Sequence, residues 1–228
     1  MRNPTVSILI TSFNEGERLL ATVHFFTTHF PDYPLLIVDD ASTDDSATLV
    51  AHTVPHIKII RHQHNKGKTA AIITGIKHVT TEYVCLFDAD LSNLDALEIS
   101  QGFKVIFQEK PAMLVFAQQN DQPIWKLLNL HVYVSGERII RTQLLQTFFQ
   151  AHMPHNYEVE IALHLWFRER ELSYTTTPMH SQNQLKLHKW DPLTAVRKSW
   201  QFYSYFFVPR VFYSFCRLRS SRSKFENS

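Results

Sequence analysis

Two aspartates separated by one residue follow an apolar run near the middle of the chain. The run is Val84-Cys-Leu-Phe, and Asp88 and Asp90 come directly after it. Carboxylate oxygens are preferred ligands of Mg²⁺ and Mn²⁺, and α/β sheets hold their ligands at the carboxyl ends of strands. A single Asp-x-Asp is also common in solvated turns. It becomes a candidate site for a divalent metal and a diphosphate because of the polar segments that precede it.

Three earlier segments carry polar residues where an apolar run ends or a helix is expected to begin. They are Thr11, Asn14 and Glu15, then Asp39 and Asp40, then Gly67 and Lys68. A hydroxyl and carboxylates can pair with the imide N–H and the hydroxyls of a uridine or guanosine. An ammonium offsets the charge of a diphosphate, and a glycine lets the backbone approach it. For the two aspartates the alternative is a turn opening, because aspartate and serine favour turns.

The elements that must position these residues alternate between strand and helix patterns. Strands are expected over 6–11, 35–38, 57–61 and 83–87, and helices over 15–28, 44–52 and 69–79. Asn14 is the expected N-cap of the first helix. Strands that alternate with helices form βαβ units. We therefore expect an α/β fold of the nucleotide-binding type, with a mostly parallel sheet flanked by helices.

The pattern is looser in the second half of the chain. Helices are expected over 94–108, 139–150 and 158–170, strands over 113–117 and 172–177, and a loop over 180–191. The loop is polar and has no periodicity, which is typical of a connection between ordered elements.

Length and charge divide the chain into two expected parts. Its 228 residues, 44% hydrophobic and 19% charged, have the composition of a soluble globular protein with one large domain. We expect that domain over 1–193, followed by a basic, aromatic, amphipathic helical tail over 194–228. The tail carries seven Lys and Arg against one acid, a net +6, so the total of +2 leaves −4 for residues 1–193.

A basic and aromatic helix is typical of a segment that lies in a membrane interface. The alternatives for the tail are a helix that packs on the sheet and a homodimer contact. No apolar run reaches the ~18–20 residues of a transmembrane helix, and Cys85 and Cys216 give no disulfide framework. We expect a cytoplasmic protein, peripheral on the inner face of the membrane. Nucleic acid is not an expected partner, because residues 1–193 are acidic.

The four polar segments, in this order and spacing, resemble the family 2 glycosyltransferases of the GT-A fold. The resemblance covers roughly residues 5–190. It is strongest to the dolichyl- and polyprenyl-phosphate sugar synthases and to glucosyl-phosphoglycerate synthase-like enzymes, and it implies a Rossmann-like GT-A domain. It also implies that Thr11 and one of Asp39 and Asp40 contact the base and ribose, with Asn14 and Glu15 in the same nucleotide-sugar site.

The resemblance assigns the diphosphate and the metal to the later segments. Gly67 and Lys68 match the family's Asn-x-Gly-Lys segment near the diphosphate, although Thr69 stands where relatives usually have glycine. Asp88 and Asp90 match the metal motif. The implied direct ligand of Mg²⁺ or Mn²⁺ is Asp90, with Asp88 on the ribose or bound through water.

Two acids and a histidine complete the candidate site. Residues 156–161, Asn-Tyr-Glu-Val-Glu-Ile, resemble a segment that carries a proposed base in relatives, which implies that Glu158 or Glu160 accepts the acceptor's proton or positions the acceptor. Their alternative is an acid favoured by the dipole of a helix N-terminus. By resemblance His180 is a further metal ligand, and a solvated loop residue is its alternative.

Together these implications predict a metal-dependent hexosyltransferase. The expected donor is a UDP- or GDP-linked sugar. The expected acceptor is a polyprenyl phosphate at the membrane surface, and the transfer inverts the anomeric carbon. The alternatives are transfer to a soluble acceptor or a polysaccharide precursor, and a non-catalytic GT-A module that only binds.

Overall fold

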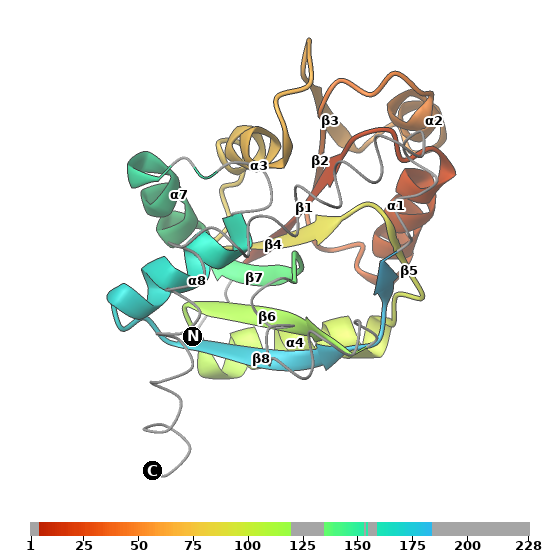
Figure 1. Ribbon diagram of the computed structural model, residues 1–228. Helices are drawn as coiled ribbons and strands as arrows, with labels where there is room; N and C mark the ends of the chain where they lie inside the picture. Colours follow the sequence, from red (N-terminus) through yellow and green to blue (C-terminus); the bar gives the residue numbers. More distant parts are fainter. Residues whose placement is uncertain (1–4, 120–134, 153, 155–158, 184–228) are drawn as a thin grey trace. The chain divides into compact units, whose positions relative to one another are not determined.

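A seven-stranded mixed sheet organises the part of the chain that the structure describes (Figure 1). The computed structural model describes residues 5–119, 135–152, 154 and 159–183. The strands lie in the order β3-β2-β1-β4-β7-β6-β8, and a separate two-stranded sheet pairs β5 with β9. Ligands of such open α/β sheets bind outside the carboxyl ends of the strands, where the strand order reverses.

The first half of the chain forms the parallel part of the sheet and confirms the predicted alternation. Its strands are β1 (Val6–Ser12), β2 (Leu35–Asp39), β3 (Lys58–Arg61) and β4 (Tyr83–Asp88), and its helices are α1 (Glu17–His29), α2 (Ser46–Thr53) and α3 (Lys68–Ile76). β1 lies between β2 and β4 and is parallel to both. The carboxyl ends of these strands therefore meet at one edge.

The second half adds three strands to the open sheet, and one of them is antiparallel to its neighbours. Its elements are β5 (Leu91–Ser92), α4 (Ala96–Glu109), β6 (Met113–Gln118), β7 (Arg138–Arg141), α7 (Thr142–Ala151), α8 (Val159–Glu169), β8 (Tyr174–Met179) and β9 (Gln182–Asn183). β7 is antiparallel to both of its neighbours, β4 and β6, whereas β6 and β8 are parallel. The sheet is mostly parallel, as predicted, with one reversed strand inside it.

The predicted helix over 139–150 is wrong at its start. Residues 138–141 form β7, and helix α7 begins only at Thr142. Ile139 joins the apolar cluster on one face of the sheet and Ile140 joins the cluster on the other, as alternation in a strand requires. Four residues are too few to show this period against the longer helical pattern that follows them.

Asn14 is not the N-cap of the first helix. The N-cap is Gly16, which has φ +56°, and the helix begins at Glu17. Asn14 itself has φ +55°, and its side-chain oxygen accepts from the backbone N–H of Thr43 at 2.8 Å. Asparagine tolerates this left-handed conformation, so it joins two loops instead of capping a helix.

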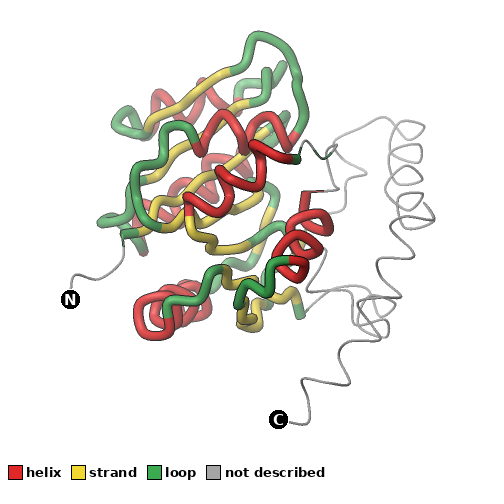
Figure 2. The backbone as a smooth tube through the Cα atoms, turned by 90° about the vertical axis from the view of Figure 1, so that its left-hand side faces the viewer, coloured by secondary structure: helices red, strands yellow, loops and turns green. Residues whose placement is uncertain are grey.

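Helices lie beside the strands of the sheet (Figure 2, helices in red). Apolar clusters fill the space on both faces of the sheet. On one face α1 and α4 contribute residues such as Val23, Phe26 and Phe103. On the other face α3, α7 and α8 contribute residues such as Ile72 and Phe167. The two layers hold the strands rigidly, so the polar ends of β1, β2 and β4 have fixed positions.

The predicted loop over 180–191 begins with ordered backbone. Leu91 pairs with Asn183 and Ser92 pairs with Gln182, so β9 lies beside the segment that directly follows Asp90. The rest of that loop and the expected tail over 194–228 lie outside the described residues. Within the described ranges, no helix is long and apolar enough to cross a bilayer.

Replacing Gly102 by alanine is expected to destabilise the protein. A Cβ atom there would lie 2.6 Å from the ring of Phe116, which is fully buried. Alanine normally stabilises a helix interior by ~1 kcal/mol relative to glycine, but overpacking a core costs about 1–3 kcal/mol. Urea unfolding should show a net loss of up to about 2 kcal/mol for Gly102→Ala. Ser100→Ala on the exposed face of α4 is the control, and an equal effect of both changes would contradict the steric explanation.

Candidate functional site

Side chains from β1, β2 and β4 meet at the carboxyl edge of the parallel strands. In the register of the sheet Thr11 lies opposite Asp88, and Ser12 lies opposite Asp39. Three segments that are far apart in the sequence therefore place polar groups on neighbouring strands. This confirms the expectation that the parallel strands bring the predicted polar residues to one edge.

Lys68 stands at the centre of this edge and joins two acids. Its Nζ lies 2.8 Å from Asp88 Oδ2 and 3.0 Å from Glu160 Oε1. Burial by itself would lower the pKa of Lys68, but the charges of Asp88 and Glu160 outweigh it and raise the pKa well above its usual value. The ammonium therefore stays charged at any physiological pH, as a partner for an anionic ligand must.

Two further charged residues lie near Lys68, Asp88 and Glu160: Arg138 begins β7, and Glu137 directly precedes it. Glu137 and Arg138 are each 1% exposed, and the sequence analysis assigned neither of them a role. Burial, reinforced by the charge of Asp88, raises the pKa of Glu137 to about 7. Burial also lowers the pKa of Arg138, against the opposing effect of Glu160 and Glu137. A Glu-Arg pair at the start of an apolar strand is the signal that could have marked them.

Gly136 allows this close approach. A Cβ atom at that position would lie 2.8 Å from Asp88 Oδ2 and 2.9 Å from Lys68 Nζ. Between Thr11, Lys68, Arg138 and Glu160 only a cavity of about 10 Å³ remains, which is room for about one water molecule. Any larger ligand must therefore bind against the outer side of this group of charges.

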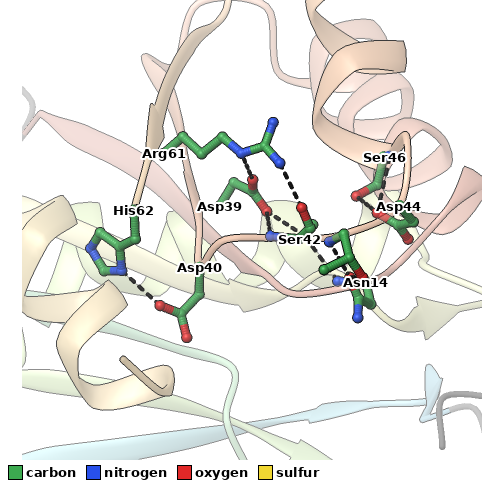
Figure 3. Close-up of polar contacts among 9 residues, drawn as sticks. Asn14, Asp39, Asp40, Ser42, Asp44, Ser46, Arg61 and His62 are labelled. Atoms are coloured by element: carbon green, nitrogen blue, oxygen red, sulfur yellow. Dashed lines mark hydrogen bonds and ion pairs between the residues drawn. The ribbon is translucent and has the colours of Figure 1, made fainter. Parts of the chain in front are cut away.

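Asp39 is bound to its own turn and to β3 (Figure 3). The side chain is fully buried, and Oδ1 accepts hydrogen bonds from the backbone N–H and the hydroxyl of Ser42. Arg61 Nε lies 3.1 Å from Asp39 Oδ2, and another nitrogen of its guanidinium donates to the carbonyl of Ser42. Asp39 therefore opens a turn, which was the alternative expected for it. This role does not exclude contact with a nucleotide.

Asp40 is bound to the loop that leads into α3. Its Oδ1 accepts from the backbone N–H of Lys66 at 2.8 Å and its Oδ2 from that of Gly67 at 2.7 Å. The ring of His62 lies on the same carboxylate, with Nδ1 2.7 Å from Oδ1. Asp40 is 3% exposed. Asp39 thus belongs to a network with Ser42 and Arg61, and Asp40 belongs to a separate network with His62 and the loop before α3.

The loop after β1 is tied to the loop after β2. Asn14 N–H donates to Ser42 Oγ at 2.9 Å, and Gly16 N–H donates to Asp44 Oδ2 at 2.9 Å. Glu15 is buried and lies 3.3 Å from Arg18. Asn14 and Gly16 therefore hold the two loops together, and Glu15 lies between them in the chain with Arg18 as its partner.

The predicted metal ligands are placed at the end of β4 and near β9. Asp88 and Asp90 are partly exposed at the turn that follows β4. His180 Nδ1 lies 2.5 Å from Glu98 Oε1, and its backbone N–H donates to Glu98 Oε2. The β5–β9 register places His180 on the side of residues 93–98, whereas Asp90 precedes the other end of β5. In the described ranges, no three Asp, Glu, His or Cys side chains gather into a group that could hold a metal.

Of the two glutamates expected on the acceptor side, the structure describes Glu160 but not Glu158. Glu160 lies in the first turn of α8, is 5% exposed and reaches Lys68. Glu158 lies outside the described residues. Glu160 is thus part of the group of charges that includes Asp88, while the expectation for Glu158 stays a prediction.

Fold and site together define the class. A mixed, mostly parallel sheet with helices on both faces and charged groups at its carboxyl edge is the GT-A, Rossmann-like architecture. The model of glycosyl transferase family 2 matches residues 7–200, and the chain belongs to this family.

Curated relatives share part of their length with this chain. The putative glycosyltransferase CsbB of Bacillus subtilis (strain 168) is 33% identical over 131 residues, which are 53% of this chain and 38% of that protein. The undecaprenyl-phosphate 4-deoxy-4-formamido-L-arabinose transferase of Sodalis glossinidius (strain morsitans) is 35% identical over 133 residues, 55% of this chain and 40% of that protein. The chain therefore spans well under half the length of these relatives.

Solved structures share the fold. Glucosyl-3-phosphoglycerate synthase from Mycobacterium tuberculosis in complex with phosphoglyceric acid has a TM-score of 0.69 at 16% identity, over 85% of this chain and 75% of that one. The same enzyme with Mn²⁺ and UDP-glucose has a TM-score of 0.63 at 17% identity, over 79% of this chain and 71% of that one.

The buried Glu137 is expected to make stability depend on pH. Its pKa of about 7 in the folded protein lies above the ordinary value of 4.5. Between these values the folded state keeps a proton that the unfolded state releases, so the free energy of unfolding falls as pH rises through this range. Glu137→Gln removes this pH dependence, so its free energy of unfolding should rise relative to that of the unmodified protein by about 3 kcal/mol as pH increases from 4 to 8.

Urea unfolding at several pH values measures this difference. Glu109→Gln is the control, because Glu109 is exposed at the end of α4. Equal pH dependence of Glu137→Gln and the unmodified protein would show that Glu137 titrates normally.

Proposed function

We propose that the chain transfers a hexose from a UDP- or GDP-linked sugar to a phosphate-bearing acceptor, with inversion and with the help of a divalent metal. The observation that carries the proposal is the group formed by Lys68, Asp88 and Glu160 at the carboxyl edge of β1 and β4. Membership of glycosyl transferase family 2 supports it. So do the structural neighbours, which were solved with Mn²⁺ and UDP-glucose.

Asp90 and Asp88 are the residues that would hold Mg²⁺ or Mn²⁺. They fit such an ion because two partly exposed carboxylates stand one residue apart at the end of β4. Magnesium commonly takes one or two carboxylates and completes its shell with substrate phosphates and water, so a group of three protein ligands is not needed. When bound, the metal would stabilise the negative charge of the leaving diphosphate. His180, which is bound to Glu98, is the weakest of the proposed ligands.

Lys68 is proposed to bind the diphosphate directly. Its two carboxylate partners fix the ammonium at the edge, and they keep it charged. A fixed cation that needs no rearrangement is worth more to a developing charge than a mobile one. Thr11 lies opposite Asp88, so the base and ribose would extend from there toward Asp39 and the loop with Asn14 and Glu15.

The contact between Glu160 and Lys68 favours an acceptor that is already ionised. One oxygen of Glu160 is occupied by the ammonium, and the side chain is buried. A hydroxyl acceptor needs a free carboxylate to take its proton, whereas a phosphate needs none. We therefore propose that Glu160 positions the acceptor. Glu158 would be the base on the acceptor side, and a phosphate acceptor has little need of a base.

The lipid form of the acceptor is the first candidate. One relative is named as an undecaprenyl-phosphate sugar transferase. The tail over 194–228, with its net charge of +6, would attach the chain peripherally to an anionic membrane. The second candidate is a soluble phosphorylated acceptor, which the complexes of the structural neighbour with phosphoglyceric acid favour. A polysaccharide precursor and a non-catalytic binding module remain as alternatives, and so does a homodimer contact for the tail.

A nucleotide panel tests the donor. Thermal shift is measured with UDP, GDP, CDP and dTDP, each with and without Mn²⁺. We expect stabilisation by UDP or GDP that requires the metal and is lost in Asp90→Ala. The control is Glu109→Ala, an exposed acid at the end of α4. No response to any nucleotide would favour the non-catalytic module.

Liposome flotation tests the attachment to membranes. The intact chain should float with anionic vesicles at low salt and lose the vesicles as salt rises, because Lys and Arg near such a surface each contribute about 1 kcal/mol. A variant that ends after Leu193 should stay unbound. A full-length variant with Arg217, Arg219 and Arg222 changed to glutamine excludes an effect of truncation on folding. Salt-independent binding of all three proteins would assign the tail another role.

A further inference from the structure

Gln118, the last residue of β6, is the centre of a buried polar network beside the candidate site. Its side-chain nitrogen donates to Ser181 Oγ at 2.8 Å and to Glu137 Oε2 at 3.3 Å. The hydroxyl of Ser181 also lies 3.1 Å from the side-chain oxygen of Gln118. All three side chains are at most 2% exposed. The network therefore joins the carboxyl end of β6 to the segment before β7 and to the segment after β8.

A primary amide suits this position because its nitrogen carries two protons. Gln118 can therefore donate to Ser181 and to Glu137 at the same time. If the amide were turned round, its oxygen would face an oxygen of Glu137 that already lies 2.9 Å from Ser135 Oγ. An apolar side chain of the same length would remove a donor from a buried carboxyl group, which is costly. The contacts thus favour one orientation of Gln118.

On one side the network supports the backbone beside Lys68. Glu137 directly follows Gly136, where a Cβ atom would lie 2.8 Å from Asp88 Oδ2 and 2.9 Å from Lys68 Nζ. The backbone N–H of Phe116 on β6 donates to the carbonyl of Glu137, one residue before β7 begins. Both the backbone and the side chain of Glu137 are thus bound to the end of β6. A shift of Glu137 would move Gly136 relative to the ammonium.

On the other side the network supports the segment that follows β8. Ser181 lies between His180, a proposed metal ligand, and β9. β9 pairs with β5, which begins directly after Asp90. The hydrogen bond from Gln118 to Ser181 therefore holds the chain between the end of β8 and this pairing. One buried amide is in contact with both segments that border the proposed diphosphate and metal sites.

We propose that Gln118 is a positioning residue, which acts through Glu137 on the diphosphate side of the site and through Ser181 on the metal side. The inference rests on the proposed function, because it takes the diphosphate and the metal as the ligands on these two sides. Gln118 touches neither ligand, since its amide is occupied by its two buried partners. The inference also gives a role to Glu137, to which the residue pattern assigned none.

The test compares a ligand that has the diphosphate with one that lacks it. Binding of UDP with Mn²⁺ is measured by calorimetry, and binding of uridine by ligand-observed NMR. Gln118→Met removes both N–H donors at nearly constant volume. We expect it to weaken UDP binding about tenfold or more, as the loss of a supporting residue commonly does, and to leave uridine binding within about twofold. Gln118 lies on β6, whereas the nucleoside is proposed to bind at β1 and β2.

Gln101→Met is the matched control, because Gln101 is exposed on α4. It should leave the binding of both ligands unchanged. GDP and guanosine replace UDP and uridine if the nucleotide panel selects GDP.

A double-mutant cycle tests the path through Ser181. Ser181→Ala should weaken UDP binding selectively, as Gln118→Met does. The double variant should lose little more than Gln118→Met alone, because both changes remove the same connection. Ser181→Ala also serves as the second variant in case Gln118→Met does not fold.

The pH profile of a third variant tests the contact with Glu137. Gln118→Glu places a second carboxyl group beside the first, and two acids this close do not ionise together readily. At about pH 6 the variant keeps its proton and can still donate it, so its UDP binding should be close to that of the unmodified protein. As pH rises to about 8, its UDP binding should weaken relative to that of the unmodified protein. Gln118→Met should bind UDP weakly at every pH.

The outcomes separate the inference from the proposed function. Equal losses of UDP and uridine binding in Gln118→Met would indicate general damage to the fold and overturn the inference, while the proposed function would stand. Unchanged UDP binding, additive losses in the double variant or a pH-independent loss in Gln118→Glu would overturn it as well. If the unmodified protein binds neither UDP nor GDP, the proposed function fails and the inference fails with it.

Discussion

The ammonium of Lys68 between Asp88 and Glu160 is the contact on which the site depends. It joins the start of α3, the end of β4 and the first turn of α8, three elements that approach each other only in the complete fold. Each carboxylate would repel the other without the cation, and the cation would be costly to bury without them. The polar edge therefore holds the ammonium in one arrangement, between two carboxylates where the strands end.

The surroundings show how the protein accommodates so many charges. Arg138 and Glu137 add a second cation and a third acid within the same region, and Gly136 removes the side chain that would separate them from Asp88. The group carries one more acid than cation, and burial together with the charge of Asp88 raises the pKa of Glu137. A divalent cation beside Asp88 and Asp90 would reduce this excess. The proposed metal and the buried acids are thus parts of one electrostatic balance.

The sequence predicted the parallel half of the sheet well, because β1 to β4 are short runs with apolar centres and helices follow β1, β2 and β3. The family resemblance assigned Lys68 and Asp88 to neighbouring parts of one site, and the two side chains are in contact at this edge. The sequence pattern missed β7, whose four residues run into the helical pattern of α7. It missed His62 and the buried role of Glu137 because neither depends on local spacing. Both are defined by partners on other strands, which a linear pattern does not contain.

The separation of these partners along the chain has a consequence for biosynthesis. Lys68, Asp88 and Gly136 leave the ribosome well before Glu160, yet the ammonium needs both carboxylates to be held. A nascent chain that stops before α8 contains β1 to β4, and its Lys68 can pair with Asp88 but not with Glu160. The full set of contacts to the ammonium therefore exists only when α8 is in place. A chain that ended before α8 would lack Glu160, and Lys68 would keep only Asp88 as its partner.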